Sequence, residues 1–498
     1  MKRFLAFLLA LACSLSLCAC NKSTETDDTT PFWEREDKPE EKTAPLFSLP
    51  YLANETLDPI SCPDGVDQTI SGLIYEGLFI LNDRFEAENQ LCDHYTYDPA
   101  SKTYEFFIRK NVKFSDGATL QASDIVASLK RAQNSARYGA RFADVVSLFA
   151  PDSDTVRFVL QTDNAAFPAL LDIPIVKSGT ENRFIPLGTG PYCQAAEGNV
   201  LVPNTVWWQG KSQPLGKIQL VESKNESNVT SLFSAYDVNL LLTNLGTSEP
   251  FGKDISVNVT EVPSTVLLYL GCNFYRTATA SGEVRRALSL GIDRKNLVSA
   301  YLAGHAVASD VPLSPASQFH TRQTADYLPS AYTDALAAMH RPYTALTLIV
   351  NEDNAYKVSV AKAIAASLSA GGIAVGVRVL SWTDYCNALA LGNYDLYLGE
   401  ARMTADFNSA PLFTAGGSLN YGGARSEETA SALRAYLSSP SKETAVAFCD
   451  AFSEAMPLIP IAFLSMSVVR QSNFSCKITP SPTTPFYRFD KWKFEKKQ

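Results

Sequence analysis

The chain has 498 residues, of which 46% are hydrophobic and 19% are charged. These values are typical of a globular protein and exclude a disordered or collagen-like chain. The formal net charge is -9. An acidic chain without a basic stripe is a poor nucleic-acid binder, because phosphate binding needs clustered Lys and Arg. The four histidines are far apart in the sequence, which weighs against a histidine-based metal centre. We also expect no cofactor.

Residues 1–19 have the features of a secretory signal peptide. A short basic start is followed by an uncharged apolar run from Phe4 to Leu17. This run is shorter than the ~20 residues that a membrane-spanning helix needs. The signal ends in LCAC, and its last residue, Cys20, stands where the bacterial lipobox has its lipid-bearing cysteine. By that resemblance the chain is cut before Cys20, which then carries a diacylglyceryl anchor. The alternative is an ordinary secreted protein.

Residues 20–44 form the predicted tether between this anchor and the globular body. They are rich in Thr, Asp, Glu, Lys and Pro and contain no aliphatic residue larger than alanine. Such a segment cannot bury enough apolar surface to fold. No later segment has 18 consecutive apolar residues, so we expect no other membrane anchor. The predicted location is the outer face of the bacterial plasma membrane, which is the periplasmic side in a Gram-negative cell.

Seven cysteines remain beyond the signal peptide and the predicted anchor, and none forms a CxxC motif. Zinc-binding and thioredoxin-like interpretations therefore lack the spacing that they need. An odd number of cysteines cannot all pair within one chain. We interpret most of them as small buried hydrophobic residues. They are Cys62, Cys92, Cys193, Cys272, Cys386, Cys449 and Cys476.

In the first half of the body, residues 103–109 and 155–161 alternate between apolar and polar side chains, as half-buried strands do. Between them, residues 123–131 have the spacing of an amphipathic helix with Ser123 as its N-cap. The FSDG sequence at residues 114–117 favours a tight turn over a binding site, because Asp and Gly are turn formers.

The second half contains a strand–helix–strand succession, which indicates a parallel crossover with its helix on one face of the sheet. Its parts are residues 347–350, 356–370 and 374–380, and Gly371-Gly372 ends the helix. Further strands are predicted over residues 264–270, 394–398 and 486–494, and a helix over residues 283–303. The fold class is therefore α/β. Because the body is large for a single core, we expect two lobes.

Six motifs follow one another along this body. They are YEGLF at residues 75–79, a long segment at 104–125, PLGTGPY at 186–192, NTVWWQG at 204–210, VRRALSLGIDR at 284–294, and the pair 380–385 and 393–395. In this order they resemble the substrate-binding proteins of ABC importers, in the family that includes the oligopeptide, dipeptide and nickel receptors. The resemblance runs from about residue 56 to beyond residue 460.

The resemblance implies a two-lobed, hinged, periplasmic-binding-protein type II-like fold that encloses its ligand between the lobes. An extra subdomain is inserted in lobe I. The implied boundaries are 45–262 for lobe I with the insert at about 81–180, 263–466 for lobe II, and 467–498 for a C-terminal segment that returns to lobe I. The implied hinge lies near residues 262–268 and 460–467.

Residues 402–408 resemble the family segment in which an aspartate pairs with the α-ammonium of a bound peptide, and Asp406 stands at that position. A carboxylate in a water-excluding cleft makes a charge-assisted hydrogen bond with an amine. The alternative is a loop aspartate that caps a turn. Two departures, a Met for the usual Trp and Ser409-Ala410 for Asp-Pro, leave the size and chemistry of the ligand open. The neighbouring candidate ligand-binding residues are Arg402, Met403, Thr404 and Phe407.

The resemblance also places residues 60–64 where lobe I approaches the peptide backbone. Main-chain hydrogen bonds hold extended peptides in many receptors. Within this segment Cys62, Pro63 and Asp64 are candidate contacts, although Pro63 offers no N–H donor. Trp382 and Tyr385 are candidates for the cleft or for the core.

The implied function is a monomeric, lipid-anchored receptor that binds peptides without chemistry and delivers them to an ABC transporter permease. The same fold with a metal chelate, an oligosaccharide or a signalling peptide as ligand is the first alternative. A surface-anchored hydrolase is the second. No GxSxG, HExxH or Cys/His signature supports it, but a carboxylate-pair glycosidase needs no fixed spacing.

Overall fold

The computed structural model describes residues 47–494, with gaps at 54–55, 63–64, 197, 246–254, 341–344, 473 and 475. The predicted signal peptide, Cys20 and the tether lie outside the described residues, as do Pro63 and Asp64.

The first sheet joins the start of the body to residues near position 220. Its strand order is β1-β10-β9-β8, with β1 parallel to β10 and the other pairs antiparallel. Aromatic side chains from the end of the chain complete its core, among them Phe474, Phe486 and Trp492. The elements are β1 (Phe47–Leu52), β8 (Tyr192–Gln194), β9 (Val200–Pro203), β10 (Ile218–Ser223), α2 (Gly65–Ile74) and α4 (Glu226–Ser234).

The second sheet is antiparallel with the order β4-β5-β7-β6, and a β2-β3 hairpin precedes it in the chain. In β5 the buried side chains alternate with partly exposed ones, which confirms the predicted strand at 103–109. The elements are β2 (Phe79–Leu81), β3 (Ala87–Asn89), β4 (Cys92–Asp98), β5 (Thr103–Ile108), β6 (Val145–Phe149), β7 (Thr155–Leu160), α3 (Ala122–Gln133), η2 (Gly139–Phe142) and η3 (Phe167–Leu170).

The third sheet has the order β11-β17-β12-β16-β14-β15, with β13 on β17. The predicted crossover is confirmed, since β14 and β15 are parallel and α9 lies between them in the chain. The strands are β11 (Leu240–Thr243), β12 (Val257–Cys272), β13 (Ala306–Ala308), β14 (Leu346–Asn351), β15 (Val375–Leu380), β16 (Leu396–Arg402) and β17 (Leu458–Gln471). The helices are α5 (Thr277–Ala280), α6 (Gly282–Leu290), α7 (Arg294–Tyr301), α8 (Pro329–Ala338), α9 (Ala355–Gly371), α10 (Trp382–Leu391), α11 (Ala410–Phe413), α12 (Glu427–Ser438) and α13 (Lys442–Ala455).

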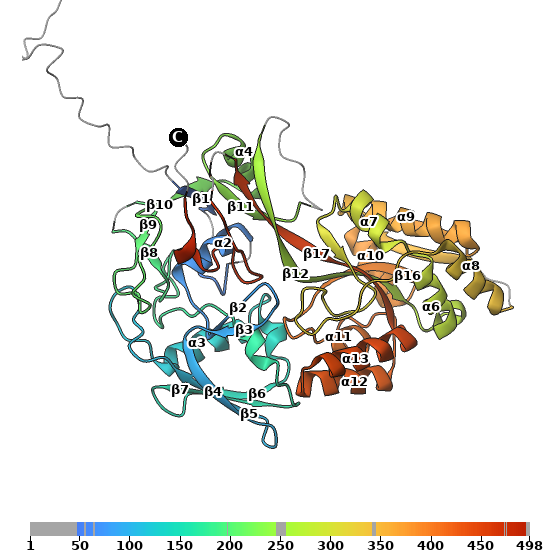
Figure 1. Ribbon diagram of the computed structural model, residues 1–498, viewed down its shortest axis with the longest axis horizontal. Helices are drawn as coiled ribbons and strands as arrows, with labels where there is room; N and C mark the ends of the chain where they lie inside the picture. Colours follow the sequence, from blue (N-terminus) through green and yellow to red (C-terminus); the bar gives the residue numbers. More distant parts are fainter. Residues whose placement is uncertain are drawn as a thin grey trace, which may run out of the picture. The chain divides into compact units, whose positions relative to one another are not determined.

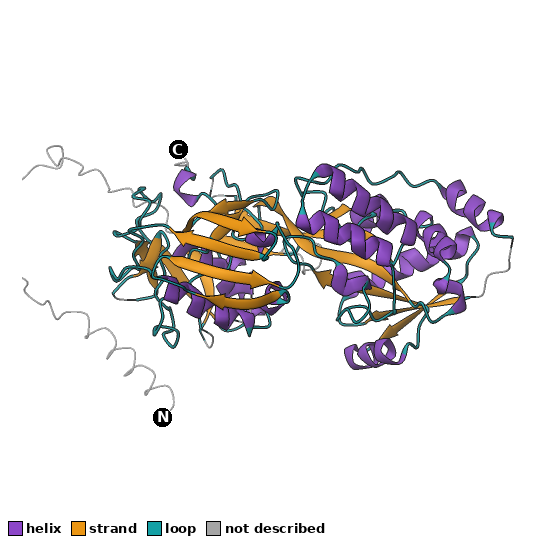
Figure 2. Cartoon of the chain, turned by 90° about the horizontal axis from the view of Figure 1, so that it is seen from below, coloured by secondary structure: helices purple, strands orange, loops and turns teal. Residues whose placement is uncertain are grey.

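The long antiparallel strands β12 and β17 run through the middle of the body (Figure 1). Residues 467–470 of β17 pair with β11, and residues 462–464 pair with β13. We call β1–β11 and the segment after β17 lobe I, and β13–β16 with α5–α13 lobe II. Strands dominate the first group and helices the second (Figure 2). The register of the β12–β17 pair shifts between Pro263 and Leu267.

Three predicted details were wrong. Helix α3 begins at Ala122 with Gln121 as its N-cap, not Ser123, because the Asp124 carboxylate accepts a hydrogen bond from the Gln121 N–H (3.1 Å). The predicted helix over 283–303 is two helices, since α6 ends at Leu290 and the side chain of Asp293 caps α7. The segment 486–494 is not a strand. It contains the short turn η4 (Phe489–Lys491), and its aromatic rings pack inward around Phe47.

The FSDG segment is a tight turn, as predicted, with Gly117 at a φ of 88°. The Gly117 N–H donates to the Phe114 carbonyl (2.8 Å), and Phe114 is buried.

The interpretation of the cysteines as buried small residues holds for five of the seven, since only Cys193 and Cys386 are half-buried or exposed. No disulfide joins the cysteines that the structure describes.

Candidate functional site

Residues 402–408, the segment predicted to contact the ligand, begin where β16 ends in the third sheet. The Met403 N–H donates to the Thr265 carbonyl (3.0 Å), and the chain then turns sharply, with Phe407 in the left-handed region at a φ of 58°. The Met403 and Phe407 side chains are both buried in a hydrophobic core. The Phe407 ring packs at 5.0 Å between centroids against Phe85, which lies in the β2–β3 hairpin. These two side chains therefore hold the segment in place.

The carboxylate of Asp406 is buried and accepts three hydrogen bonds. The donors are the Thr404 hydroxyl (2.5 Å), the Asn164 side-chain amide (2.9 Å) and the Asn408 N–H (3.2 Å). Burial raises the pKa of Asp406 above its ordinary value, and the hydrogen bonds oppose that effect. The bond to Asn408 closes a turn, so the turn-capping alternative has a physical basis here. Ligand contact at Asp406 stays a prediction.

The bond from Asn164 ties lobe I to lobe II. Asn164 is itself buried, and its side-chain oxygen accepts a hydrogen bond from the Ala166 N–H (2.9 Å). Next to it, the Ala165 N–H donates to the carbonyl of Leu437 on α12 (2.8 Å). Asp406 therefore lies where the two lobes touch.

Arg402, at the end of β16, lines a cavity of about 150 Å³ whose other walls come from lobe I. Its charged lining residues are Arg137, Arg141, Arg402 and Asp172, and we call it the arginine cavity. Residues of α2 and β2 and the segment 482–484 complete it. Desolvation, and then the positive charge of Arg137, lower the pKa of Arg402. The negative charge of Glu400 opposes them, and Arg141 adds a smaller lowering effect.

Asp172 is the single carboxylate among the residues that line this cavity, and it is already in use. It is buried, forms an ion pair with Arg141, and accepts a hydrogen bond from the Thr483 hydroxyl (2.9 Å). Arg141 also donates to the Leu170 carbonyl (3.1 Å). Among the described residues, by contrast, the Arg402 guanidinium has neither a hydrogen bond nor an ion pair. The Arg402 side chain is exposed, and the negative charge of Glu400 favours its charged form.

Cys62 is buried beside this cavity. Its N–H donates to the Asp58 carbonyl (2.9 Å), and it contributes weakly to the raised pKa of Tyr75 and Tyr138, for which burial is the main cause. Both tyrosines line the arginine cavity. Cys62 itself does not line the cavity.

Trp382 and Tyr385 belong to α10 and do not line the arginine cavity. Their rings stack at 5.9 Å between centroids. The Tyr385 ring is buried and its hydroxyl donates to the Leu398 carbonyl (3.0 Å), whereas Trp382 is exposed. Tyr385 is a core residue in this structure.

Sequence reasoning missed Arg137, Arg141, Asp172 and Asn164. The two arginines stand four residues apart just after α3, but no motif includes them, and the cavity forms only when distant segments meet.

Among the described residues, no group of three His, Cys, Asp or Glu side chains is arranged to hold a metal ion. Within the same residues, no helix has the length and apolarity of a membrane span.

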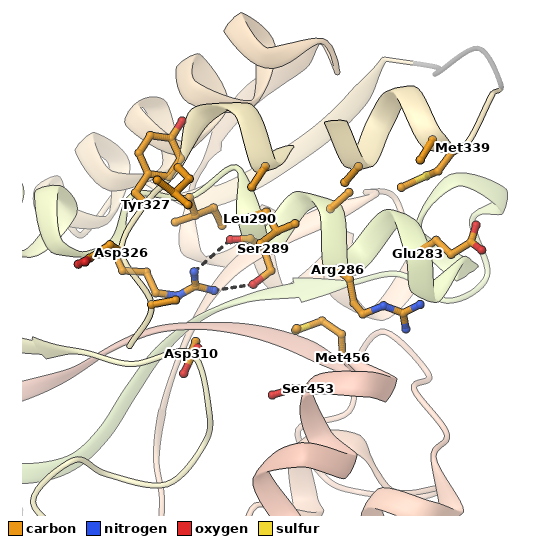
Figure 3. Close-up of a pocket in the computed structure, with 18 of the residues that line it drawn as sticks. Glu283, Arg286, Ser289, Leu290, Asp310, Asp326, Tyr327, Met339, Ser453 and Met456 are labelled. Atoms are coloured by element: carbon orange, nitrogen blue, oxygen red, sulfur yellow. Dashed lines mark hydrogen bonds between the residues drawn. The ribbon is translucent and has the colours of Figure 1, made fainter. Parts of the chain in front are cut away.

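A second, larger cavity of about 650 Å³ lies in lobe II between α6 and α8 (Figure 3). It also contains arginines, but each has a partner. Arg294 donates to the Ser289 hydroxyl (2.7 Å) and to the Pro460 carbonyl (2.8 Å), and Arg286 pairs with Glu454 (3.1 Å).

A family model for bacterial extracellular solute-binding proteins, family 5, matches residues 86–423, which is more than half of the chain. Among curated proteins, the glutathione-binding protein GsiB of Escherichia coli (strain K12) is 26% identical over 277 residues, which make up 52% of this chain and 54% of GsiB. The match thus spans little more than half the length of this relative.

Solved structures extend the likeness to nearly the whole chain. The oligopeptide-binding protein AppA of Bacillus subtilis, in complex with a nonapeptide, has a TM-score of 0.61 at 17% identity, covering 90% of this chain and 99% of AppA. NikZ of Campylobacter jejuni, in complex with Ni(L-His), has a TM-score of 0.64 at 17% identity and the same coverage.

These likenesses confirm the expected mixed α/β, two-lobed type II-like fold of periplasmic binding proteins. The matched family consists of binding proteins, not enzymes. On the extent of the family match, this chain belongs to the bacterial extracellular solute-binding proteins of family 5.

Proposed function

We propose that this chain is a receptor that captures di- or oligopeptides between its lobes and delivers them to the permease of an ABC transporter, without catalysing a reaction. The observation that carries the proposal is that lobes I and II meet at a buried carboxylate, Asp406, through its hydrogen bond with Asn164. Ligand sites are typically concave regions between domains with a few convergent polar groups.

Asp406 is the proposed partner of the peptide α-ammonium. The ammonium would take the place of the Asn164 amide, which is a neutral donor. A charged donor makes the stronger hydrogen bond to a carboxylate. The hinge that admits the ligand is proposed at residues 262–268 and 460–467, within the long strands β12 and β17, and the register shift after Pro263 supports a flexible point there.

The names of the relatives support a peptide ligand. GsiB is described as binding glutathione, and AppA was solved with a nonapeptide. NikZ was solved with Ni(L-His), which keeps a metal chelate as the second candidate.

The receptor is proposed to act as a monomer on the outer face of the plasma membrane, held by a lipid on Cys20 and the tether 20–44. The LCAC sequence at the end of the signal peptide supports the anchor. Mass spectrometry of the protein from its native membrane tests it, because lipidation would add a diacylglyceryl mass to a chain that begins at Cys20.

Native mass spectrometry of the body, expressed from Thr43, tests the ligand. We expect a ladder of bound peptide masses that disappears in Asp406→Ala and persists in the matched control Asp334→Ala, an exposed position on α8. A single non-peptide mass would replace the peptide proposal with the chelate. Peptides that bind Asp406→Ala as tightly as the wild type would remove Asp406 from the site.

A further inference from the structure

We infer that lobe I carries a basic face that docks on anionic lipid headgroups, so that the body lies against the membrane surface with this face toward it. The face, which we call the C-terminal basic face, consists of Lys477, Arg488, Lys491 and Lys493. These four side chains line one cavity of about 790 Å³. The inference goes beyond the proposed function, because it concerns the membrane surface and not the captured solute.

The C-terminal segment separates its charges from its apolar side chains. Phe489, Trp492 and Phe494 pack their rings against one another at the core of the first sheet. Lys491 and Lys493 stand on either side of Trp492 in the sequence and are exposed. The alternation that is typical of a strand thus places the cations on the outer side of this segment.

Two of the lysines are neighbours although they are distant in the sequence. An antiparallel bridge pairs Cys476 with Phe494, so Lys477 and Lys493 are the next residues across the two stretches. Like charges opposite each other destabilise such a pair. Neither these two lysines nor Lys491 forms an ion pair or a hydrogen bond with a described residue. An anion from outside the chain would relieve the repulsion.

The acidic side chains of the same cavity do not neutralise these lysines. Glu88 lies 3.3 Å from the Arg488 guanidinium, and Glu261 lies 2.8 Å from the His305 ring. Asp83, the third acidic residue of the lining, is exposed and forms no ion pair with a described residue. Three unpaired lysines therefore face one unpaired aspartate.

The distribution of charge over the chain favours a membrane as the partner. Residues 477–498 contain six basic and two acidic side chains, whereas the whole chain has a net charge of -9. An anionic membrane therefore repels the body as a whole and attracts it at this face. Protein partners, by contrast, are anchored mainly by large aromatic or apolar side chains. No large hydrophobic side chain is exposed among the described residues 477–494.

The proposed anchor is joined to the body at the same face. The ring of Phe47, the first residue of β1, packs at 6.2 Å between centroids against Phe494, and the end of the chain lies beside β1 (Figure 1). Pro45 and Leu46 alone separate β1 from the proposed tether. A lipid on Cys20 would therefore present this face to the bilayer at a high effective concentration, at which weak attraction is enough for docking.

Sedimentation with vesicles tests the inference without the lipid anchor. Residues 46–498 form a compact unit that contains the described hydrophobic cores, so the body expressed from Thr43 folds on its own. At low ionic strength, we expect it to bind vesicles of equal parts phosphatidylglycerol and phosphatidylcholine at least ~20-fold more tightly than vesicles of phosphatidylcholine alone. The preference should disappear in ~1 M salt, where the Debye length is ~3 Å.

A triple variant assigns the preference to this face. It should lose ~5-fold in affinity for the anionic vesicles for each lysine removed, with an unchanged melting temperature because the side chains are exposed. Its changes are Lys477→Gln, Lys491→Gln and Lys493→Gln. A control triple variant loses the same charge at exposed positions elsewhere and should stay within ~3-fold of the wild type. Its changes are Lys110→Gln, Lys362→Gln and Lys442→Gln.

Equal binding of the two kinds of vesicle by the wild type would overturn the inference. So would equal losses in the two triple variants, because the effect would then come from net charge alone. A body that binds neither vesicle would also overturn it and leave an acidic protein as the partner of this face. If the first triple variant does not fold, the three single variants replace it, each with an expected loss of ~5-fold. All of these outcomes leave the proposed function intact, because the test uses no peptide.

Discussion

The arginine cavity and the larger cavity of Figure 3 both contain arginine side chains, but they differ in how those charges are balanced. In the larger cavity Arg294 bonds to protein oxygens, and Arg322 lies 3.5 Å from Asp310. In the smaller cavity Arg402 is exposed and makes no hydrogen bond or ion pair with a described residue, although the charge of Glu400 favours its charged form. The larger cavity is also built within lobe II, whereas the smaller one draws on both lobes. The two cavities therefore differ in where they lie, within one lobe or between two, and in how firmly their arginines are bonded to the protein.

The largest expected effect comes from breaking the Arg141–Asp172 ion pair in the arginine cavity. Arg141→Ala leaves the Asp172 carboxylate buried without its cation. Breaking a buried ion pair costs about 3–5 kcal/mol. We expect a loss of that order in the free energy of unfolding, measured by urea denaturation. Arg434→Ala, at an exposed pair, should change it by less than ~1 kcal/mol. Equal losses in the two variants would mean that the Arg141–Asp172 pair is not a structural contact.

Glu76 is a buried acidic group whose hydrogen-bond donors are neutral side chains, whereas Asp172 is paired with an arginine. Glu76 accepts hydrogen bonds from Trp207 (3.1 Å), Trp208 (2.8 Å) and Thr189 (2.9 Å). Burial nevertheless raises the pKa of Glu76 from 4.5 to about 7.

Because the folded protein holds the Glu76 proton more tightly than the unfolded chain does, stability from this group is complete below about pH 4.5 and falls as the pH rises to about 7. At ~1.4 kcal/mol for each pH unit, the loss approaches ~3 kcal/mol. Urea denaturation across this range should show a shallower fall for Glu76→Gln than for the wild type. Parallel curves for the two proteins would contradict the raised pKa.

Arg294→Ala sharpens the comparison because it should affect stability and not binding. The variant leaves the Ser289 and Pro460 carbonyls without the guanidinium that they bond. Buried groups that lose their partner cost about 1–3 kcal/mol. We expect that loss in the free energy of unfolding, together with an affinity for tri-alanine within ~2-fold of the wild type. A larger loss of affinity would give the larger cavity a part in binding.

The smallest effect is expected at the rim of the larger cavity. Arg286 pairs with Glu454, whose side chain is highly exposed. Exposed ion pairs contribute about 0–1 kcal/mol. The melting temperature of Arg286→Ala should therefore stay within ~3 °C of the wild type. A larger drop would show that this rim stabilises lobe II.

The sequence was most informative where one local pattern determines the structure. The alternation at residues 103–109 and the crossover 347–380 needed only side-chain periodicity and glycine stops. The helix over 283–303 was predicted too long because apolar spacing continues across Gly291 and Asp293, which end one helix and cap the next. Likewise, the alternating aromatic residues at 486–494 suit a strand, but their rings pack inward around β1.

The candidate site was only partly accessible from sequence. The resemblance pointed to residues 402–408, and it could not indicate that the Met403 and Phe407 side chains lie in the core. Asn164 is bonded to Asp406 although 242 positions separate them. The arginine cavity likewise depends on segments that meet only in the folded protein, so no local pattern could reveal it.

A crystal structure with tri-alanine bound tests the central claim most directly. The account predicts that the peptide lies between the two lobes, with its α-ammonium at the Asp406 carboxylate. A peptide that occupies the cavity between α6 and α8, or whose ammonium lies away from Asp406, would contradict it.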